Sequence, residues 1–293
     1  MSAPSAGGPR PAPEGLVLVD KPGGMTSHDV VNRVRRALGT RKVGHAGTLD
    51  PMATGLLVMG VGRATRLLRY LSGLDKDYEG VGRLGEETDT LDAEGTITRT
   101  APVTASRADV EAAFASMTGD LEQRPPAYSA VKVGGEALYK SARRGEAVEA
   151  APRPIHVSAF DVGSLDGRDV GFRCSVSSGT YVRVLVADAG AALGCGAHLI
   201  ALRRTRVGPF DLREARPLDD LGTPLPVEQA VRHLPSLRLD HPDEAAAAAN
   251  GRPLGPAGIE GPYAVFDPNG SLVAVYRDEH AKAVPEMVLA PPV

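Results

Sequence analysis

The chain has 293 residues, of which 42% are hydrophobic and 24% charged, and its net charge is −3. This length accommodates one large or two unequal domains, and the composition is that of an ordinary globular protein. Its apolar runs are well short of the roughly 18 residues that a membrane-spanning helix needs, and two cysteines are too few for a disulfide framework. We therefore expect a globular, cytoplasmic protein with no membrane partner.

The first elements are legible from capping and turn residues. Residues 1–13 are mostly Pro, Ala, Gly and Ser, so we expect a flexible tail and not a signal peptide. The stretch GLVLVDKPGGMTS (15–27) then predicts a short buried strand, a Pro-Gly turn and the start of a helix. Thr26 and Asp29 have the spacing of a capping box, and Gly39 ends this helix.

The middle of the chain mixes strands and helices. Residues 76–98 have the aromatic, Gly and Thr content of strands joined by turns, and a second helix is predicted from Ser106 to Met117. Residues 171–194 predict a strand, a turn and another helix. Because no regular strand-helix repeat is present, an α+β fold is favoured over a doubly wound parallel sheet.

The residue composition and pattern change after about residue 232. A short Ala-rich helix is followed by Pro/Gly turns and by two strand-like runs, YAVF and SLVAVY, joined by DPNG, which is a strong hairpin signal. We therefore expect a small β-rich domain at 233–293, after a larger domain at 14–232. The sequence contains no long apolar stripe of the kind that would indicate a dimer interface, so we expect a monomer.

Charge is segregated along the chain. Residues 1–75 hold ten Lys/Arg against five Asp/Glu, whereas residues 211–293 hold seven against thirteen. Single basic clusters are often solvated helix faces, but five of them in a protein that is acidic on balance favour a phosphate-backbone partner. The acidic excess of the C-terminal part is unfavourable for phosphate contact there.

Several classes of chemistry lack their motifs. The chain has no GxxxxGK[ST] loop, and GVGRAT at 60–65 lacks the third glycine of a dinucleotide fingerprint. Neither a CxxC pair nor an HExxH spacing is present, so we expect no metal site and no cofactor.

The stretch RKVGHAGTLDPMATGLLVMG (41–60) places His45 and Asp50 among small residues before an apolar run. An Asp-Pro pair by itself is most often a turn in which the carboxylate bonds the backbone. Taken as a functional loop, it contains Gly44, Gly47 and Gly55, which leave the backbone room for a close approach by the phosphate-backbone partner.

Six motifs in order indicate more than a turn. From Gly15 to about Phe210 the chain resembles the bacterial tRNA pseudouridine synthase B family. The matching motifs are LVLVDKPGGMTSHDVV (16–31), VGHAGTLDPMATGLL (43–57), KDYEGVGRLGEETDTLDAEG (76–95), QRPPAYSAVKVGGEALYKSARRGEAV (123–148), SSGTYVRVLVADAG (177–190) and GAHLIALRRTRVGPF (196–210). The resemblance implies a pseudouridine synthase fold, with a mixed, mainly antiparallel sheet flanked by helices and a PUA-like C-terminal domain. It also implies isomerisation of the uridine at position 55, in the T-arm of tRNA, to pseudouridine.

The resemblance also assigns roles to residues. Asp50 matches the catalytic aspartate, Tyr78 the tyrosine that stacks on the target base, and Arg183 the arginine that pairs with the aspartate. His45 matches the histidine that lies against the flipped nucleotide, and Leu202 the apolar wall of the pocket. The remaining substrate or RNA contacts expected from the resemblance and from the basic clusters are Lys21, Tyr181, Arg143, Arg144, Arg203 and Arg204.

The reaction explains these residue types. The N1–C1′ bond of the uridine breaks, the uracil turns, and a C5–C1′ bond forms before C5 loses its proton, so neither a redox cofactor nor a metal is required. A buried carboxylate stays ionised only beside a cation, which Arg183 supplies to Asp50. Tyr78 is a poor base at neutral pH but a good stacking platform.

Access to the uridine requires base flipping. His45, five residues before Asp50, is placed to fill the gap that an extruded base leaves, and a basic flap at about 124–153 is placed to hold the RNA arm. Two alternatives remain open on these residues: a tRNA-folding chaperone without essential catalysis, and a hydrolase that uses Asp50 and His45 as acid and base.

Overall fold

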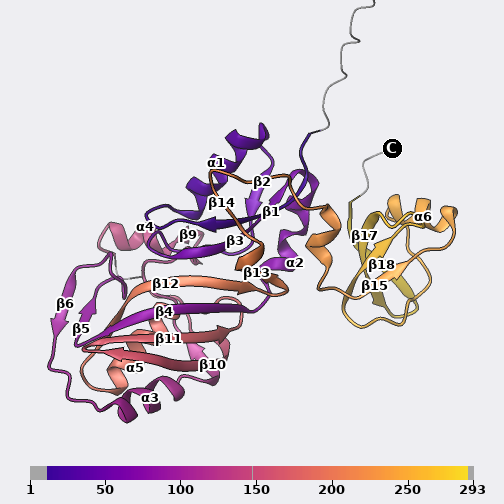
Figure 1. The fold of residues 1–293 in the computed structure, drawn as a ribbon. Helices are drawn as coiled ribbons and strands as arrows, with labels where there is room; N and C mark the ends of the chain where they lie inside the picture. Colours follow the sequence, from indigo (N-terminus) through magenta and orange to yellow (C-terminus); the bar gives the residue numbers. More distant parts are fainter. Residues whose placement is uncertain (1–11, 147, 290–293) are drawn as a thin grey trace, which may run out of the picture.

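The protein is described here by a computed structural model that covers residues 12–146 and 148–289 (Figure 1). The flexible tail expected at 1–13 therefore lies outside the described residues, apart from Ala12 and Pro13. Most of the chain is built on a ten-stranded mixed sheet with strand order β14-β1-β3-β12-β4-β11-β10-β7, in which β13 also pairs with β12 and β2 with β3. Its strands are β1 (Gly15–Lys21), β2 (Val43–His45), β3 (Thr54–Val61), β4 (Lys76–Leu84), β7 (Gly119–Gln123), β10 (Arg153–Asp166), β11 (Asp169–Val176), β12 (Ala197–Val207), β13 (Phe210–Asp211) and β14 (Arg216–Pro217).

Most neighbouring strands of this sheet are antiparallel. The pairs β1–β14 and β12–β3 are parallel, while β1–β3, β12–β4, β11–β4, β10–β11 and β10–β7 are antiparallel. The predicted α+β class is confirmed, with a mainly antiparallel sheet flanked by helices.

The two predicted capping boxes are present. Helix α1 (Ser27–Leu38) begins after Thr26, which exchanges hydrogen bonds with Asp29, and it ends at Gly39 in the left-handed conformation with φ 64°. Helix α3 (Arg107–Ala115) begins in the same way, with Ser106 and Asp109 as partners. It ends two residues before the predicted Met117, whose backbone N–H closes a turn onto Phe114 instead.

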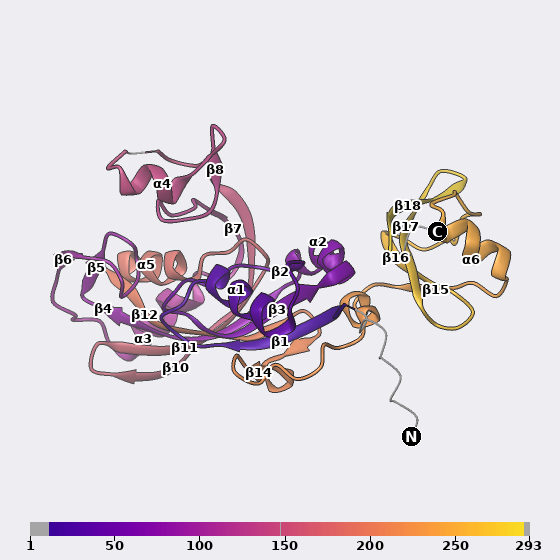
Figure 2. The same cartoon turned by 90° about the horizontal axis from the view of Figure 1, so that it is seen from above.

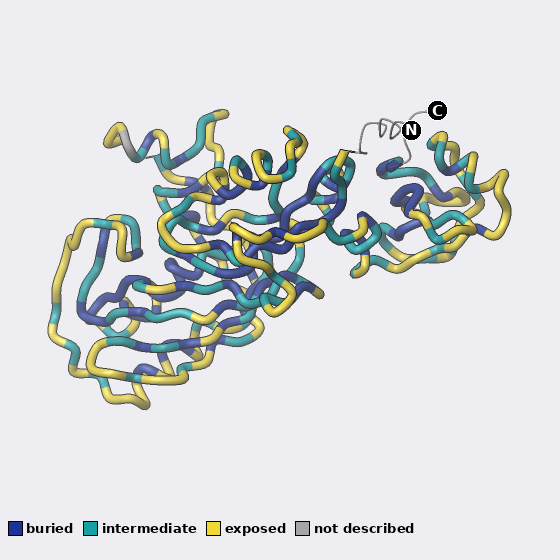
Figure 3. Tube along the Cα trace, turned by 45° about the horizontal axis from the view of Figure 1, so that its top comes forward, coloured by how far each residue is buried: buried dark blue, intermediate teal, exposed yellow. Residues whose placement is uncertain are grey.

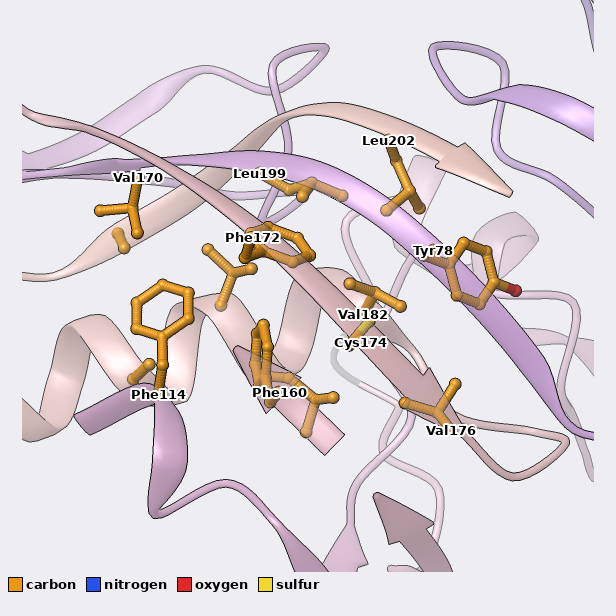
Figure 4. Close-up of a cluster of buried hydrophobic side chains, with 14 of the residues drawn as sticks. Tyr78, Phe114, Phe160, Val170, Phe172, Cys174, Val176, Val182, Leu199 and Leu202 are labelled. Carbon is orange, nitrogen blue, oxygen red and sulfur yellow. The ribbon is translucent and has the colours of Figure 1, made fainter. Parts of the chain in front are cut away.

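Helices α3 and α5 (Val182–Ala192) cover one face of the sheet and form its main core. Phe114 of α3 packs edge-on against Phe160 of β10, with ring centroids 4.9 Å apart, and Phe160 packs against Phe172 of β11 at 5.0 Å. Phe172, Cys174 and Val176 point into this cluster, as the predicted alternation of β11 requires (Figure 4).

Shorter elements surround the sheet. The 3-10 helix η1 (Gly62–Leu67) and helix α2 (Leu68–Ser72) follow β3, and β5 (Glu86–Thr88) pairs with β6 (Ile97–Thr100) as a two-stranded ribbon. Two further 3-10 helices, η2 (Leu212–Glu214) and η3 (Val227–Val231), lie on the path to the C-terminal domain.

The predicted flap, residues 124–153, leaves the sheet after β7 and returns at the start of β10. Its described part contains β8 (Lys132–Val133), β9 (Glu136–Ala137) and helix α4 (Leu138–Arg143). Figure 2 shows it standing away from the face of the sheet, and Figure 3 shows that much of its trace is exposed. Gly134 and Gly135 join β8 to β9 with φ of 60° and 90°, a backbone that glycine adopts at low cost.

The C-terminal domain is a four-stranded sheet with helix α6 (Pro242–Ala249) packed against it. Its strands are β15 (Ser236–Arg238), β16 (Pro262–Phe266), β17 (Leu272–Glu279) and β18 (Lys282–Val288). The hairpin predicted from DPNG joins β16 to β17 and is confirmed. One hydrophobic cluster includes Leu16 and Leu18 of β1 together with Val275 and Met287 of this domain, so the domain packs firmly against the larger part of the chain.

Candidate active site

A cavity of about 610 Å³ lies between the flap and the main sheet. Its walls come from the loop before β3, from strands β4 and β12, from the flap and from the N-terminus of α5. Seven of the eleven predicted site residues line it: His45, Asp50, Tyr78, Tyr181, Arg183, Leu202 and Arg204. Residues more than 150 positions apart in the sequence thus meet in one cavity.

The loop that carries Asp50 is fixed on both sides. Before Asp50, the Ser27 hydroxyl accepts from the Leu49 N–H at 2.9 Å and donates to the Leu49 carbonyl at 3.1 Å. After Asp50, the Lys21 ammonium donates to the carbonyls of Pro51 at 3.1 Å and Ala53 at 2.7 Å. These contacts hold the Asp50 carboxylate, whose side chain is 32% exposed, at the cavity wall.

Arg183 pairs with Asp50 as predicted, but it has a closer partner. Its Nη1 lies 3.6 Å from Asp50 Oδ2 and 2.8 Å from Asp92 Oδ2. Its Nη2 donates to the Tyr128 carbonyl in the flap at 2.5 Å. Asp92, in the loop after β5, was not among the predicted residues. Its position in the motif KDYEGVGRLGEETDTLDAEG is the only signal in the sequence that points to it.

The charge balance at Asp50 differs from the prediction. Burial raises the pKa of the Asp50 carboxyl, the Asp92 carboxylate adds to the rise, and the Arg183 guanidinium opposes it. Arg183 therefore acts in the predicted direction, but burial and the second carboxylate outweigh it. A carboxylate with a raised pKa is a stronger base and nucleophile once it is ionised.

Tyr78 and Leu202 supply the apolar side of the cavity. Tyr78 is 7% exposed and lies at the edge of the main core, beyond Val182 and Cys174 (Figure 4). Burial raises the pKa of the Tyr78 phenol, against the opposing effect of Arg204, which bonds its hydroxyl. Because a raised pKa keeps the phenol protonated at neutral pH, no phenolate is available to act as a base, and the ring is better suited to stacking.

His45 and Tyr181 also line the cavity. His45 ends strand β2, and burial, with Arg204 as a second cause, lowers the pKa of its imidazole and so favours the neutral form. The Tyr181 ring lies under the Arg183 guanidinium, 5.9 Å from its central carbon. The Tyr181 backbone is fixed by Gln123, which accepts from its N–H at 2.7 Å and donates to its carbonyl at 3.1 Å.

Two predicted RNA contacts, Lys21 and Arg204, are internal supports. Both are 0% exposed. Besides Pro51 and Ala53, Lys21 donates to the Pro22 carbonyl, and burial lowers its pKa to about 8. Arg204 donates to the carbonyls of Leu56, Thr48 and Gly47. Because their donors are satisfied by backbone oxygens, the geometry gives both side chains a supporting role, and contact with RNA stays a prediction.

The other basic predictions fall outside the cavity. Arg203 points to the opposite face of the sheet from Leu202 and Arg204, where it pairs with Asp20 at 2.7 Å, and its predicted contact with RNA stays a prediction. In the flap, Arg144 is exposed and forms ion pairs with Glu136 and Glu146. Arg143 ends helix α4, and its side chain is outside the described part of the structure.

The glycines of the Asp50 loop make room for protein, not for RNA as predicted. A Cβ at Gly55, whose φ is 98°, would lie 2.3 Å from the Arg204 carbonyl oxygen. At Gly47 it would meet the Lys76 side chain at 3.3 Å, and at Gly44 the Leu68 side chain at 2.9 Å. These glycines therefore allow the loop to pack closely against Arg204, Lys76 and Leu68 of the same chain.

Two general features of the described residues bear on the candidate functions. Across 12–146 and 148–289, no three His, Cys, Asp or Glu side chains gather in a way that could hold a metal ion. Over the same ranges, no helix has the length and apolar character required to span a membrane.

Comparison with known proteins connects this cavity with a family. The family profile described as TruB family pseudouridylate synthase (N terminal domain) matches residues 35–182. The profiles described as tRNA pseudouridylate synthase B C-terminal domain and tRNA Pseudouridine synthase II, C terminal, match residues 183–233 and 234–290.

Curated relatives match over nearly the whole chain. The tRNA pseudouridine synthase B of Mycobacteroides abscessus is 49% identical over 94% of this chain and 96% of its own length. That of Nocardia farcinica is 50% identical over 94% of each chain. Among solved structures, a chain of an archaeal box H/ACA sRNP Nop10-Cbf5 complex matches with a TM-score of 0.71 and 28% identity, over 94% of this chain and 86% of its own. A chain of a Cbf5-Nop10-Gar1 complex matches with a TM-score of 0.74 and 29% identity, over 94% and 85%.

Proposed function

The chain belongs to the TruB family of pseudouridylate synthases, and from this premise we propose that it converts the uridine at position 55 of tRNA, in the T-arm, to pseudouridine. One observation carries the assignment of the site. The Asp50 carboxylate and the Arg183 guanidinium lie 3.6 Å apart at the wall of a cavity that also holds Tyr78 and Leu202. A carboxylate, a cation and an aromatic platform are the groups that the isomerisation requires.

In this proposal the cavity holds the target nucleotide flipped out of its stack. Asp50 is the catalytic carboxylate, and Arg183 orients it and favours its ionised form. The Tyr78 ring stacks on the uracil and permits it to rotate in its own plane, so that C5 replaces N1 at C1′. Leu202 closes the apolar side of the pocket and excludes water from the reacting atoms.

Base flipping needs compensation for lost stacking. His45 sits at the cavity wall as a mostly buried, neutral imidazole, a flat group suited to the space that the extruded base leaves. The flap, which carries Tyr128 and Tyr139 into the cavity wall, is placed to close over the RNA.

The same proposal covers the organisation of the chain. We assign residues 14–232 to the catalytic domain, with the flap at 124–153, and residues 233–293 to a PUA-like domain. The protein acts on tRNA as a monomer in the cytoplasm.

The experiment uses tRNA labelled with tritium at uracil C5, because C5 loses its hydrogen only if the base is isomerised. We expect the protein to release tritium without added nucleotide, and Asp50→Asn to abolish release while tRNA affinity stays within about threefold. Tight tRNA binding without release would instead favour the RNA chaperone. Release that survives in Asp50→Asn would remove Asp50 from the chemistry.

A further inference from the structure

Buried polar atoms without a hydrogen-bond partner gather around the cavity. They are His45 Nδ1, Ser129 Oγ, Thr180 Oγ1 and Arg183 Nε. Elsewhere in the described residues, such side-chain atoms occur only in Arg35 and His233. Since buried polar groups in folded proteins are nearly always paired, this concentration marks a wall whose polar atoms are open to pairing by a bound ligand or by water. His45 and Arg183 already have roles in the proposed function, whereas Ser129 and Thr180 have none.

The two unassigned hydroxyls belong to one wall of the cavity. Ser129 is 5% exposed and directly follows Tyr128, whose carbonyl accepts a hydrogen bond from Arg183 Nη2. Thr180 lies in the turn that leads into α5, and the next residue, Tyr181, is bonded through its backbone to Gln123 at the base of the flap. The base of the flap and the N-terminus of α5 are therefore adjacent.

The N-terminus of α5 adds the backbone N–H groups of Val182 and Arg183 to this wall, whereas the Val184 N–H already donates to the Tyr181 carbonyl at 3.0 Å. The helix has 11 residues, and no side chain caps its first turn. The first N–H groups of a helix have no partner within the helix, and the aligned peptide dipoles place a partial positive charge there. Hydroxyl and amide donors at an uncapped helix N-terminus are a typical setting for a phosphate group.

The cationic side chains around the cavity are already committed to the protein. Arg204 donates to three backbone carbonyls, and Lys76 donates to those of Ser72 at 3.1 Å and Leu74 at 2.5 Å. Arg183 directs Nη1 to Asp50 and Asp92 and Nη2 to the flap, so its guanidinium stands between the carboxylates and the Ser129 wall. That arrangement reduces the repulsion that an anion at the wall would otherwise feel.

We propose that Ser129, Thr180 and the first turn of α5 bind a backbone phosphate of the RNA substrate next to the target nucleotide. This inference rests on the proposed function and adds a subsite to it. A phosphate accepts hydrogen bonds from several donors on one side and carries the charge that a helix N-terminus favours. The edge of uracil is neutral and places an N–H donor between its two carbonyls, which matches this set of donors less well.

The first arm of the test removes the hydroxyls from the full-length protein. On a short T-arm RNA hairpin we expect Ser129→Ala and Thr180→Val each to lower kcat/KM about tenfold, the effect of one lost bond to a charged group. Thr180→Ser, which keeps the hydroxyl, should stay within about twofold of the wild type. Ser158→Ala is the control, because Ser158 lies exposed on β10 and bonds only the Ser175 carbonyl. Thermal unfolding checks that each variant is folded.

The second arm removes the charge from the RNA. Hairpins carry a neutral methylphosphonate at one of the two linkages that flank the target uridine. At one of these linkages we expect the wild type to lose about tenfold in kcat/KM, and Ser129→Ala and Thr180→Val to add less than about twofold to that loss, since the contact is already gone. Full additivity at both linkages, or variants as active as the wild type, would overturn the phosphate site. A wild type that modifies neither hairpin nor tRNA would overturn the proposed function itself.

Discussion

The nearest carboxylate to Arg183 is that of Asp92: Nη1 of Arg183 donates a hydrogen bond of 2.8 Å to Oδ2 of Asp92. Both side chains are almost fully buried, at 5% and 3% exposure. A buried ion pair of this kind fixes geometry more than it adds stability, because desolvation offsets much of the attraction. Asp92 therefore acts as the anchor that places Arg183 beside the more exposed Asp50.

Asp92→Asn tests this anchoring role. Asparagine keeps the size of the side chain but removes the charge, so Arg183 should shift and orient Asp50 less well. We expect single-turnover pseudouridine formation to slow at least about tenfold while tRNA affinity stays within about threefold, since one hydrogen bond to a charged group is lost inside the site. Asp89→Asn, an exposed change in the same loop whose carboxylate accepts from the Thr96 N–H, is the matched control. A normal rate in Asp92→Asn would show that Arg183 is positioned without it.

Arg183→Lys removes the forked shape and retains the charge. The guanidinium reaches Asp50 and Asp92 through Nη1 and the Tyr128 carbonyl through Nη2. A single ammonium cannot reproduce this planar arrangement, so we expect most of the activity to be lost, by about a hundredfold or more in kcat. Stopped assays of pseudouridine content measure the effect. Turnover near that of the wild type would mean that charge alone suffices at this position.

Asp50→Asn should stabilise the protein at neutral pH. Burial raises the pKa of the Asp50 carboxyl in the folded state, so the folded protein favours the protonated form. The stability associated with this proton is fully present below the unfolded pKa of about 4 and is lost as pH rises through the folded pKa. The neutral amide avoids that loss. We expect Asp50→Asn to melt at a higher temperature than the wild type at pH 7.5 and the difference to shrink toward pH 4. A lower melting temperature at pH 7.5 would contradict this.

Lys21→Met separates support of the loop from contact with RNA. The Lys21 ammonium holds the carbonyls of Pro51 and Ala53, directly after Asp50, and has no exposed surface. Without it the loop should loosen and those oxygens lose their partner. We expect kcat to fall about tenfold or more with tRNA affinity within about twofold, because no phosphate contact is removed. Filter binding and single-turnover rates check this; a parallel loss of affinity would instead place Lys21 against the RNA.

Local signals in the sequence were sufficient to predict several helices and strands. The Thr26–Asp29 capping box, Gly39 and the alternation of β11 concern residues that are close in the chain, so spacing alone predicts them. The Asp50–Arg183 contact required the family resemblance, because the two residues are 133 positions apart. Asp92 lies 91 positions from its partner, and nothing in its neighbourhood marks it as a ligand of an arginine.

Nothing in the sequence predicts which charged side chains are buried. The pair Arg203–Arg204 has the appearance of one basic patch, yet strand geometry sends the two side chains to opposite faces. Arg204 is buried because three backbone carbonyls, in the Asp50 loop and strand β3, accept hydrogen bonds from its guanidinium. Backbone acceptors of this kind carry no signature in side-chain composition, and the same holds for Lys21.

The C-terminal domain is attached through a carboxylate that contacts α2. Glu286 of β18 accepts from Arg69 Nη2 at 2.9 Å and from the Tyr70 hydroxyl at 3.0 Å, and its other oxygen accepts from Arg277 Nε at 2.6 Å. Its side chain is 16% exposed. Burial opposes ionisation of Glu286, but Arg277, Tyr70 and Arg69 together outweigh it and lower its pKa.

Glu286→Gln should therefore weaken the contact between the domains. We expect a loss of about 1–2 kcal/mol in the free energy of unfolding at pH 7, since charged hydrogen bonds become neutral ones. Because the folded pKa of Glu286 is lowered, its contribution is present above the unfolded value of about 4.3 and is lost as pH falls below it. The stability difference from the wild type should thus shrink as pH falls below about 4 and through the lowered folded pKa. Urea unfolding at several pH values measures it, with the exposed Glu279→Gln as control. An unchanged midpoint at pH 7 would mean that the shared hydrophobic cluster alone holds the domains together.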